Sequence, residues 1–282
     1  MTSAAVVFDR QYSLAARGAS FRTVNGIGLY ALPCIDALGM VDHGFTARTG
    51  GVSEGCFSSL NLSFTRPEER ANVSENYRRL SLAAGFPFES MVLDHYEHGT
   101  TVRRVDRQDC GCGYLREALP FCDGVVTNDP AVTLITGHAD CMALYVVDPV
   151  TRCIGLAHAG WRGALGRMGK CLVEALCREY GAVPADLVAG VGPSICPDCF
   201  EVGEDVARLF LDAFPDTSIY QAGKPGKAYI DLWKVMFRQF CEAGVLPQHI
   251  AISGVCTMED GRLFSYRREG KTGGMAAYLR LK

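Results

Sequence analysis

The sequence lacks the features of several specialised classes of protein. Its 282 residues include 28 basic and 31 acidic side chains, for a net charge of −3, and without a basic excess nucleic acid is a poor partner. No apolar run is long enough to span a bilayer, and the N-terminus has no apolar region as long as a secretory signal requires. We therefore expect a cytoplasmic protein without nucleic-acid or membrane partners.

Histidine is scarce, with only six residues in the chain. A blue-copper centre alone uses two histidines and a cysteine, so the remaining histidines, which are scattered, are too few for a further copper cluster. Cysteine is abundant by comparison. Its thirteen residues are odd in number and unevenly spaced, and in the cytoplasm they stay reduced. We expect mainly small core residues and free thiols, with a few metal ligands among them.

The pattern of apolar residues predicts a mixed fold in one domain that spans residues 1–282. Segments rich in branched residues predict strands at 44–47, 132–135, 142–147, 153–157, 187–191 and 250–253. Helical spacing of apolar residues predicts helices at 67–84, 164–180, 202–214 and 231–243, with loops at 106–119 and 221–227. The turn at Asp148-Pro149 makes residues 142–157 a hairpin, which argues against a purely parallel sheet and favours an α/β or α+β class.

Three residues in this pattern suit a metal site. Cys141 begins the strand that precedes His158 in the hairpin, and neighbouring strands can bring such residues within ligand distance. His98 stands in the segment Tyr96-Glu97-His98-Gly99. Zinc accepts imidazole nitrogen and thiolate sulfur, and three protein ligands leave a fourth position open for catalysis. We predict one mononuclear metal site at His98, Cys141 and His158.

The same residues admit another chemistry. Cys141 could be a thiol nucleophile with His158 as its base, oriented by Asp140, and spacing does not separate this hypothesis from metal binding. Taken alone, Cys141 would be a buried apolar cysteine.

The run His158-Ala159-Gly160-Trp161-Arg162-Gly163 joins a predicted strand to a predicted helix. Free N–H groups at the start of a helix favour an anion, and Arg162 can add a bidentate donor for phosphate or carboxylate. The alternative is a glycine turn that serves only packing, with His158 bonded to the backbone.

Two further cysteine groups could have roles of their own. Cys196-Pro197-Asp198-Cys199 precedes a predicted helix and is similar to a redox dithiol, although it lacks the early βαβ placement of such motifs. Cys110, Cys112 and Cys122 could form a structural zinc site, but no fourth ligand has suitable spacing.

An ordered series of motifs extends from about Asp42 to the C-terminus. They are HGFTARTGGVS at 43–53, SLNL at 59–62, HG at 98–99, DGVVTN at 123–128, ADC at 139–141, HAGWRG at 158–163, GPSI at 192–195, FEVG at 200–203, CT at 256–257 and FSYRR at 264–268. In this order the set resembles the YfiH/laccase-domain family, also known as the polyphenol oxidase-like or peptidoglycan-editing-factor family. Residues 1–41 precede the resemblance and are expected to be an N-terminal extension.

The resemblance implies a four-layer αββα sandwich with mixed sheets and a metal triad at His98, Cys141 and His158. It implies a zinc-dependent enzyme for purine nucleosides, which cleaves adenosine, inosine or methylthioadenosine with phosphate and also deaminates adenosine. The laccase name records an older assignment as a copper-dependent polyphenol oxidase. Other members are linked to editing of a peptidoglycan precursor by hydrolysis, which is the alternative activity for the same site. We expect a monomer or small homo-oligomer.

Further residues take predicted roles within this scheme. Arg48 and Arg162 are expected to hold phosphate, because guanidinium matches its oxygens, and Asn61 to bind a sugar hydroxyl or phosphate. Glu97 and Asp140 are the nearest carboxylates in sequence for moving protons. Structural ion pairs are the alternative for each arginine.

Some positions depart from the family pattern and affect substrate choice. Tyr96 replaces a usual glutamine, His138 a threonine, Met142-Ala143 a leucine-proline pair and Gly274 an arginine. His138 is three residues from Cys141, and we expect it to support a ligand or face solvent rather than bind the metal.

Overall fold

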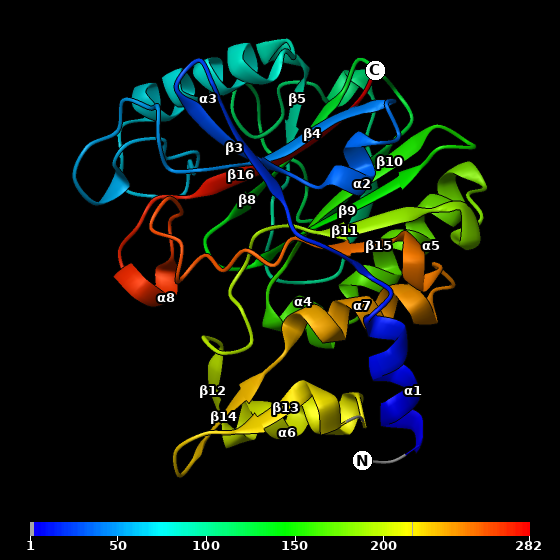
Figure 1. Ribbon diagram of the computed structural model, residues 1–282. Coiled ribbons are helices and arrows are strands. Elements are labelled where there is room, and N and C mark those ends of the chain that lie inside the picture. The colour runs from blue at the N-terminus through cyan, green and yellow to red at the C-terminus, as the bar shows by residue number, and fades with distance from the viewer. Residues whose placement is uncertain (1–2, 216) are drawn as a thin grey trace.

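The computed structural model describes residues 3–215 and 217–282 and has four main layers. In Figure 1 they follow one another as helix α3, a six-stranded sheet, a seven-stranded sheet, and the helices α4, α5 and α7. The fold is therefore the predicted mixed α/β sandwich of αββα type. Within the described residues, no helix combines the length and apolar character needed to cross a membrane.

Both large sheets mix parallel and antiparallel pairs. The seven-stranded sheet has the order β1 (Ala16–Arg17), β15 (Ile250–Ile252), β11 (Val188–Val191), β9 (Met142–Asp148), β10 (Cys153–Ala159), β7 (Gly124–Thr127) and β6 (Val102–Arg104). The six-stranded sheet has the order β2 (Ser20–Val24), β3 (Ile27–Ala31), β4 (Val41–Thr46), β16 (Met275–Leu281), β8 (Thr133–His138) and β5 (Met91–Leu93).

Three hydrophobic clusters fill the three spaces between the layers. Strand β9 shows how one strand serves two of them. Met142, Leu144 and Val146 pack in the cluster shared with the helices, while Tyr145 and Val147 pack in the cluster between the sheets. A strand buried on both faces needs no polar alternation, and this explains the continuous apolar run at 142–147. The third cluster lies between the six-stranded sheet and α3.

The predicted hairpin is confirmed, because β9 and β10 pair antiparallel along their whole length. Asp148 closes the turn by accepting hydrogen bonds from the Val150 N–H at 2.8 Å and from the Thr151 hydroxyl at 2.6 Å. Short polar side chains stabilise turns in this way.

Two predicted helices end where glycine adopts a left-handed conformation. Helix α3 (Arg70–Ala84) stops at Gly85 and α5 (Met168–Tyr180) stops at Gly181, with φ of 78° and 69°. Helix α7 (Leu232–Glu242) begins after the predicted cap, Asp231, whose carboxylate accepts from the Lys234 N–H at 2.9 Å. The prediction of helix 67–84 starts three residues too early.

Two predictions of local structure are wrong, and a third has shifted bounds. Residues 164–180 form two helices, α4 (Trp161–Leu165) and α5, because Arg167 has a φ of 66° and interrupts them. The helix predicted at 202–214 is preceded by strand β12 (Glu201–Gly203) and is α6 (Glu204–Ala213). The loop predicted at 221–227 includes parts of β13 (Tyr220–Ala222) and β14 (Lys227–Ile230), which pair with each other. Strand β14 also pairs with β12, so the three strands form a small third sheet next to α6 (Figure 1).

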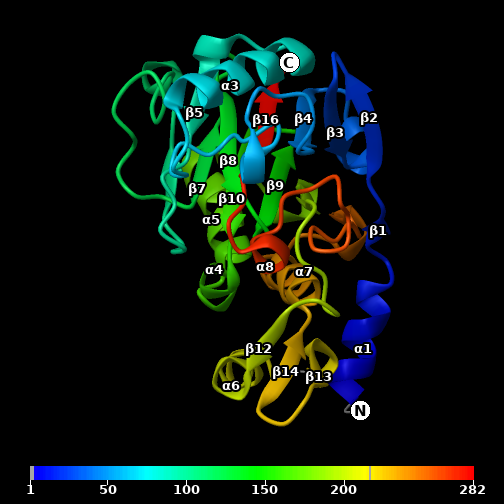
Figure 2. The same cartoon turned by 90° about the vertical axis from the view of Figure 1, so that its left-hand side faces the viewer.

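The N-terminal segment contributes to both large sheets. Helix α1 (Ser3–Tyr12) packs on α7, where the Phe8 and Tyr12 rings lie 5.9 and 5.1 Å from the Phe237 ring. Strand β1 then pairs parallel with β15, and β2 and β3 extend the other sheet. Figure 2 shows this segment running along one side of the molecule.

Short helices complete the described chain. They are α2 (Pro33–Asp36), α8 (Tyr266–Glu269), and the 3-10 turns Gly55–Phe57, Phe88–Ser90, Arg107–Asp109, Pro184–Asp186, Thr217–Ile219 and Pro247–His249. The region predicted as a loop at 106–119 is irregular apart from one of these turns.

Candidate metal centre and its cavities

The structure brings His98, Cys141 and His158 together, with one ligand atom from each within 4.8 Å of the others. Cys141 immediately precedes β9, and His158 lies on β10, where it pairs with Ala143. His98 comes from the loop after β5, and its ring lies 4.9 Å from that of His158. The hairpin therefore places two of the donors, and a loop from the other sheet supplies the third.

Asp123, which the sequence analysis gave no role, holds two of these donors in place. Its Oδ1 lies 3.1 Å from His158 Nδ1, and its Oδ2 accepts from the N–H groups of Gly99 and Glu97 at 2.8 and 3.2 Å. One buried carboxylate thus orients the His158 ring and fixes the loop that carries His98. Because Nδ1 of His158 is used by Asp123, Nε2 is left for a metal, as in many metal sites. The DGVVTN motif was the available signal for this residue.

The backbone around the donors is tightly constrained. His98 and Asp140 have φ values of 65° and 91°, which residues other than glycine rarely adopt. A Cβ on Gly160 would lie 2.9 Å from Cδ2 of His98 and 3.2 Å from Sγ of Cys141. Glycine is therefore required at position 160 by the close approach of two donors.

Cys141 and His158 form a coupled pair. Burial raises the pKa of the Cys141 thiol, but the charge of His158 and hydrogen bonds from His158 and His98 outweigh it and lower the pKa to about 6. Burial lowers the pKa of His158, but the Cys141 thiolate and Asp123 raise it to about 10. The thiolate is the form that binds metals and also the form that attacks as a nucleophile. Both chemistries predicted for Cys141 thus suit its surroundings.

Asp140 does not orient His158, so that prediction is wrong. Its carboxylate accepts from the Thr257 hydroxyl at 2.6 Å and from the Arg267 N–H at 2.7 Å. Both oxygens therefore tie the Cys141 segment to the region before β16. Glu97, the other predicted proton carrier, is exposed.

His138 is buried beside the donors without being one of them. Its Nδ1 lies 3.1 Å from the Cys141 carbonyl and its Nε2 lies 2.7 Å from the Thr136 hydroxyl. Burial and the charge of His158 hold the pKa of His138 well below its usual value. A neutral ring with both nitrogens bonded supports the Cys141 backbone, which is the kind of role expected for this residue.

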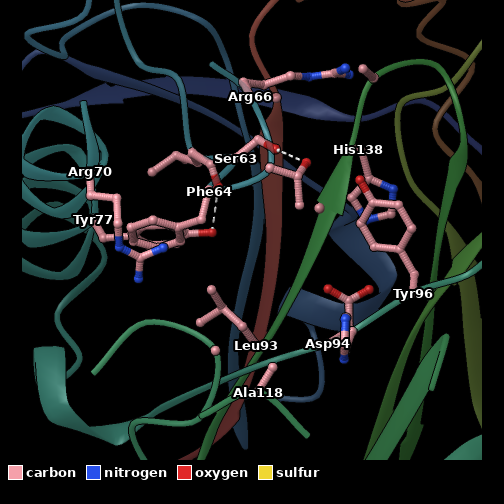
Figure 3. Close-up of a pocket in the computed structure, with 17 residues that line it drawn as sticks. Ser63, Phe64, Arg66, Arg70, Tyr77, Leu93, Asp94, Tyr96, Ala118 and His138 are labelled. Carbon is pink, nitrogen blue, oxygen red and sulfur yellow. Dashed lines mark hydrogen bonds between the residues drawn. The ribbon is translucent and has the colours of Figure 1, made fainter. Parts of the chain in front are cut away.

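A cavity of about 250 Å³ lies beside the donor set. Figure 3 shows Asp94, Tyr96 and His138 on one side of it, with Phe64, Tyr77 and Arg70 on the other. The Tyr96 ring lies 4.4 Å from that of His158 at an interplanar angle of 30°, so a lining residue of this cavity packs against one of the three predicted metal ligands. Aromatic side chains with a few polar groups are typical of small-molecule sites.

A second cavity of about 140 Å³ lies on the other side of Ala139. Its walls include Cys141, Gly160 and Trp161 together with Ile195 and Phe200. Ala139 lines both cavities, and of the three predicted ligands Cys141 lines the second.

Asp94 is an unusual carboxyl in the wall of the first cavity. Its Oδ2 is buried and has no hydrogen-bond partner among the described residues. Burial raises the pKa of Asp94 to about 8, against the opposing charge of His158. The group is therefore mainly a neutral acid at pH 7. Asp94 was not among the predicted site residues, and it directly follows the buried strand β5.

The residues predicted to bind phosphate or sugar have other partners. Arg48 pairs with Glu269 at 2.8 Å and donates to the Ser58 carbonyl at 3.0 Å. Arg162 is exposed and lies over the Trp161 ring at 4.4 Å. Asn61 is buried, and its amide donates to Glu68 at 2.6 Å.

The Oδ1 atom of Asn61 accepts hydrogen bonds from the N–H groups of Ser63 and Gly274 at 3.1 and 2.8 Å. Both of these residues line the first cavity, so Asn61 shapes a wall of it from behind.

Two arginines that the sequence analysis did not single out line the first cavity. The Nε atom of Arg66 is buried and has no hydrogen-bond partner within the part of the chain that the structure describes. Arg70 lies over the Phe64 ring at 4.6 Å. Neither residue belongs to the motifs that carried the resemblance.

Known proteins are similar to this chain in sequence and in fold. A family model described as multi-copper polyphenol oxidoreductase laccase matches residues 42–282. "Purine nucleoside phosphorylase YlmD" of Geobacillus stearothermophilus is 35% identical over 84% of this chain and 88% of its own. "Purine nucleoside phosphorylase" of Deinococcus radiodurans is 37% identical over 86% of this chain and 89% of its own. "Adenosine deaminase RL5", from an unknown prokaryotic organism, is 31% identical over 82% and 90%.

The crystal structure of YlmD from Geobacillus stearothermophilus superposes with a TM-score of 0.86, covering 93% of this chain and 98% of that chain at 32% identity. Sequence and fold therefore agree over most of the molecule, and the resemblance found in the motifs is confirmed. This protein belongs to the laccase-like family whose model is described as multi-copper polyphenol oxidoreductase laccase.

Proposed function

We propose that this protein is a zinc-dependent enzyme that cleaves purine nucleosides with phosphate and also deaminates adenosine. The observation that carries the proposal is the His98, Cys141, His158 donor set, in which Cys141 lines the second cavity and His158 packs against Tyr96 of the first. The names of the relatives, purine nucleoside phosphorylase and adenosine deaminase, support this substrate class. Adenosine, inosine and methylthioadenosine are the proposed substrates, and the cytoplasm is the proposed location of a monomer or small homo-oligomer.

The donors fit zinc in kind and in number. Two imidazoles and one thiolate are common zinc ligands, and a three-ligand site keeps one position open. Zinc held by these three residues would supply Lewis acidity to a bound substrate. Copper fits this donor set less well than zinc, although the family name refers to copper oxidases. Among the described residues, two groups of side chains could hold a metal ion, and only this one includes histidine.

The first cavity suits a purine base. Tyr96 and Phe64 present aromatic rings to it, and purines stack on such rings. His138 adds a neutral imidazole whose nitrogens are already bonded, so it contributes shape rather than charge. We propose that the base lies against Tyr96, next to the donor His158.

Asp94 is the group that we propose for proton transfer. In phosphorolysis the departing base gains electron density and needs a proton. Asp94 is a neutral acid with an oxygen that has no partner in the described structure, and it lies in the wall of the same cavity. Such a raised pKa near neutrality suits general acid catalysis. Asp94 replaces Asp140, whose oxygens are both bonded.

Phosphate needs cationic partners near the cavity. We retain Arg48 and Arg162 as proposed phosphate-binding residues and add Arg66. Arg48 must exchange its pairing with Glu269 for phosphate, while Arg66 has an Nε without a partner in the described residues. Asn61 is proposed to act through the cavity wall, because its amide is used by Glu68, Ser63 and Gly274.

The test is a substrate profile of zinc-loaded protein. Adenosine, inosine and methylthioadenosine are each incubated with and without inorganic phosphate, and free base, sugar phosphate and deaminated nucleoside are separated and measured. We expect cleavage that depends on phosphate and deamination that does not. Absence of phosphate-dependent cleavage of all three substrates would overturn the proposal. A cell-wall aminoacyl precursor, assayed in parallel, tests the editing hydrolase that would then take its place.

A further inference from the structure

A second group of metal-ligand side chains lies outside the site described above. Cys196, Cys199, Cys256 and Glu259 each offer one ligand atom, and these atoms all lie within 4.8 Å of one another. Cys196 and Cys199 follow β11, whereas Cys256 and Glu259 follow β15. The spacing is thus Cys-x-x-Cys joined to Cys-x-x-Glu from two neighbouring strands.

The distances suit a tetrahedral ion. Zinc binds thiolate sulfur at about 2.3 Å, so ligand atoms at two corners of a tetrahedron lie about 3.8 Å apart. Sγ of Cys199 lies 3.6 Å from a carboxylate oxygen of Glu259. The other ligand atoms are close enough that small side-chain rotations would bring them to this spacing.

Backbone hydrogen bonds hold the two turns against each other. The Ser194 N–H donates to the Val255 carbonyl at 3.1 Å, and the Thr257 N–H donates to the Ser194 carbonyl at 3.2 Å. Within the first turn, the Cys196 carbonyl accepts from the Cys199 N–H at 3.1 Å. The backbone therefore brings the cysteines together before any ion is considered.

A further hydrogen bond favours the thiolate form of Cys256. The Cys196 N–H donates to Sγ of Cys256 at 3.3 Å, and such bonds around a ligating sulfur are typical of metal sites. Cys196 and Cys256 are buried, Cys199 is half-buried and Glu259 is exposed. An ion could therefore enter from the surface at Glu259 and become shielded by the three sulfurs.

The surroundings argue against the redox dithiol considered for Cys196 and Cys199. Burial and the neighbouring cysteines raise the pKa of Cys196 well above its usual value. Burial likewise raises that of Cys199 to about 11. Redox-active dithiols have a lowered thiol pKa.

We propose that Cys196, Cys199, Cys256 and Glu259 bind a structural zinc ion, separate from the ion at His98, Cys141 and His158. Four protein ligands close the coordination sphere, as in structural rather than catalytic sites. The proposal does not depend on the proposed function.

The ion would act on the wall of the second cavity. Ile195 and Phe200 flank the Cys196–Cys199 turn, and both line this cavity with Cys141. The Ile195 N–H donates to the Asp140 carbonyl at 3.0 Å, and Thr257, next to Cys256, donates to the Asp140 carboxylate. Fixing the two turns thus fixes the residue that precedes Cys141.

The first experiment counts zinc in purified protein by elemental analysis. We expect two ions per chain in the wild type, one in Cys141→Ala, one in Cys199→Ser and none in the double variant. Cys56→Ser is the matched control, because Cys56 is also partly buried and belongs to neither group; it should retain two. Glu259→Gln, at an exposed position, should keep the fold and release one ion at a lower chelator concentration than the wild type.

A second measurement needs no variant in the cluster. Under reducing conditions, Cys199 of intact protein should resist alkylation until a chelator is added, while Cys56 should react equally in both cases. The proposal is overturned if Cys141→Ala contains no zinc and Cys199 reacts regardless of chelator. If instead Cys141→Ala keeps every ion of the wild type, the His98 site fails and the cysteine site stands.

Discussion

The two groups of metal-ligand residues are held in place by different means. His158 lies on a central strand and Cys141 immediately before the strand paired with it, and Asp123 orients His158 and the His98 loop together. Cys199 and Glu259 lie on turns near the surface, where hydrogen bonds join the backbones but little fixes the side chains. The fold itself thus builds the first group, whereas the second group would gain its rigidity from an ion. A prebuilt, partly open site suits chemistry, and a closed site on turns suits stability.

Cys141→Ala should have the largest effect in the molecule. Loss of a central donor should lower kcat/KM by about 10³-fold or more, while the circular dichroism spectrum stays near that of the wild type because the surrounding sheet folds without an ion. The zinc content should fall by one. Full zinc content with no activity would favour Cys141 as a nucleophile rather than a ligand.

Loss of the ion from the turns should act in the opposite way, on stability more than on chemistry. Cys199→Ser should lower the free energy of unfolding by about 2–4 kcal/mol at ordinary zinc concentrations, the range expected when a tightly bound ligand of the folded state is lost. Denaturant unfolding of this variant and of Cys56→Ser, with and without added zinc, checks it. Equal stability of the two variants would contradict the distinction drawn between the two groups.

Asp123→Asn tests whether the first group is prebuilt. Loss of the carboxylate that orients His158 should weaken zinc binding by about 10–100-fold, as measured by competition with a chelator. Asp94→Asn is the control, because the Asp94 carboxyl forms no hydrogen bond with His98 or His158. The zinc affinity of this variant should equal that of the wild type. If both variants bind zinc like the wild type, orientation by Asp123 is not what prepares the site.

Removal of a phosphate-binding arginine should have a smaller and selective effect. Arg66→Ala and Arg162→Ala should raise KM for phosphate about tenfold, since a charge-assisted hydrogen bond is lost, and should leave deamination nearly unchanged. Arg48→Ala should behave likewise if Arg48 can leave Glu269. Arg178→Ala, on the exposed face of α5, is the control. Equal loss of phosphorolysis and deamination would indicate a structural role for the arginine.

The smallest predicted effect is a pH-dependent change in stability at Asp94. Its folded-state pKa of about 8 lies above the value near 3.9 of an unfolded chain, so the folded state binds the extra proton between these limits. The contribution of Asp94 to stability therefore falls as pH rises from about 4 to 8. Asp94→Asn should be more stable than the wild type by roughly 1 kcal/mol or more at pH 7, with a smaller difference at pH 5. Denaturant unfolding at several pH values checks this, and a constant difference would contradict the raised pKa.

The sequence was informative where neighbours along the chain are also neighbours in space. Asp148 and Pro149 marked the turn between β9 and β10, and the hairpin then placed Cys141 near His158. The resemblance supplied the layers and named the same third ligand, His98. It supplied no partner for His158, because Asp123 reaches that ring across strands whose pairing the sequence does not reveal.

Backbone conformations that the residue type does not favour could not be predicted from the sequence either. Arg167 takes a left-handed φ that interrupts a continuous apolar stripe, so periodicity predicted one helix where there are two. Asp94 acquires its chemistry from burial, and burial depends on the packing of both sheets. The cysteine group depends on the pairing of Ser194 with Cys256, which lie 62 positions apart in the printed sequence.

The position of the N-terminal strands limits how far the chain can be shortened. The family model begins at residue 42, yet β1 covers one side of β15 and β3 covers one side of β4. A fragment that starts at Asp42 would expose a sheet edge in each of the two sheets. Open edges of this kind pair with strands of other molecules. The fragment would therefore tend to aggregate although it retains every proposed ligand, and shortened forms made for crystallisation should keep the chain from Ala16 onward.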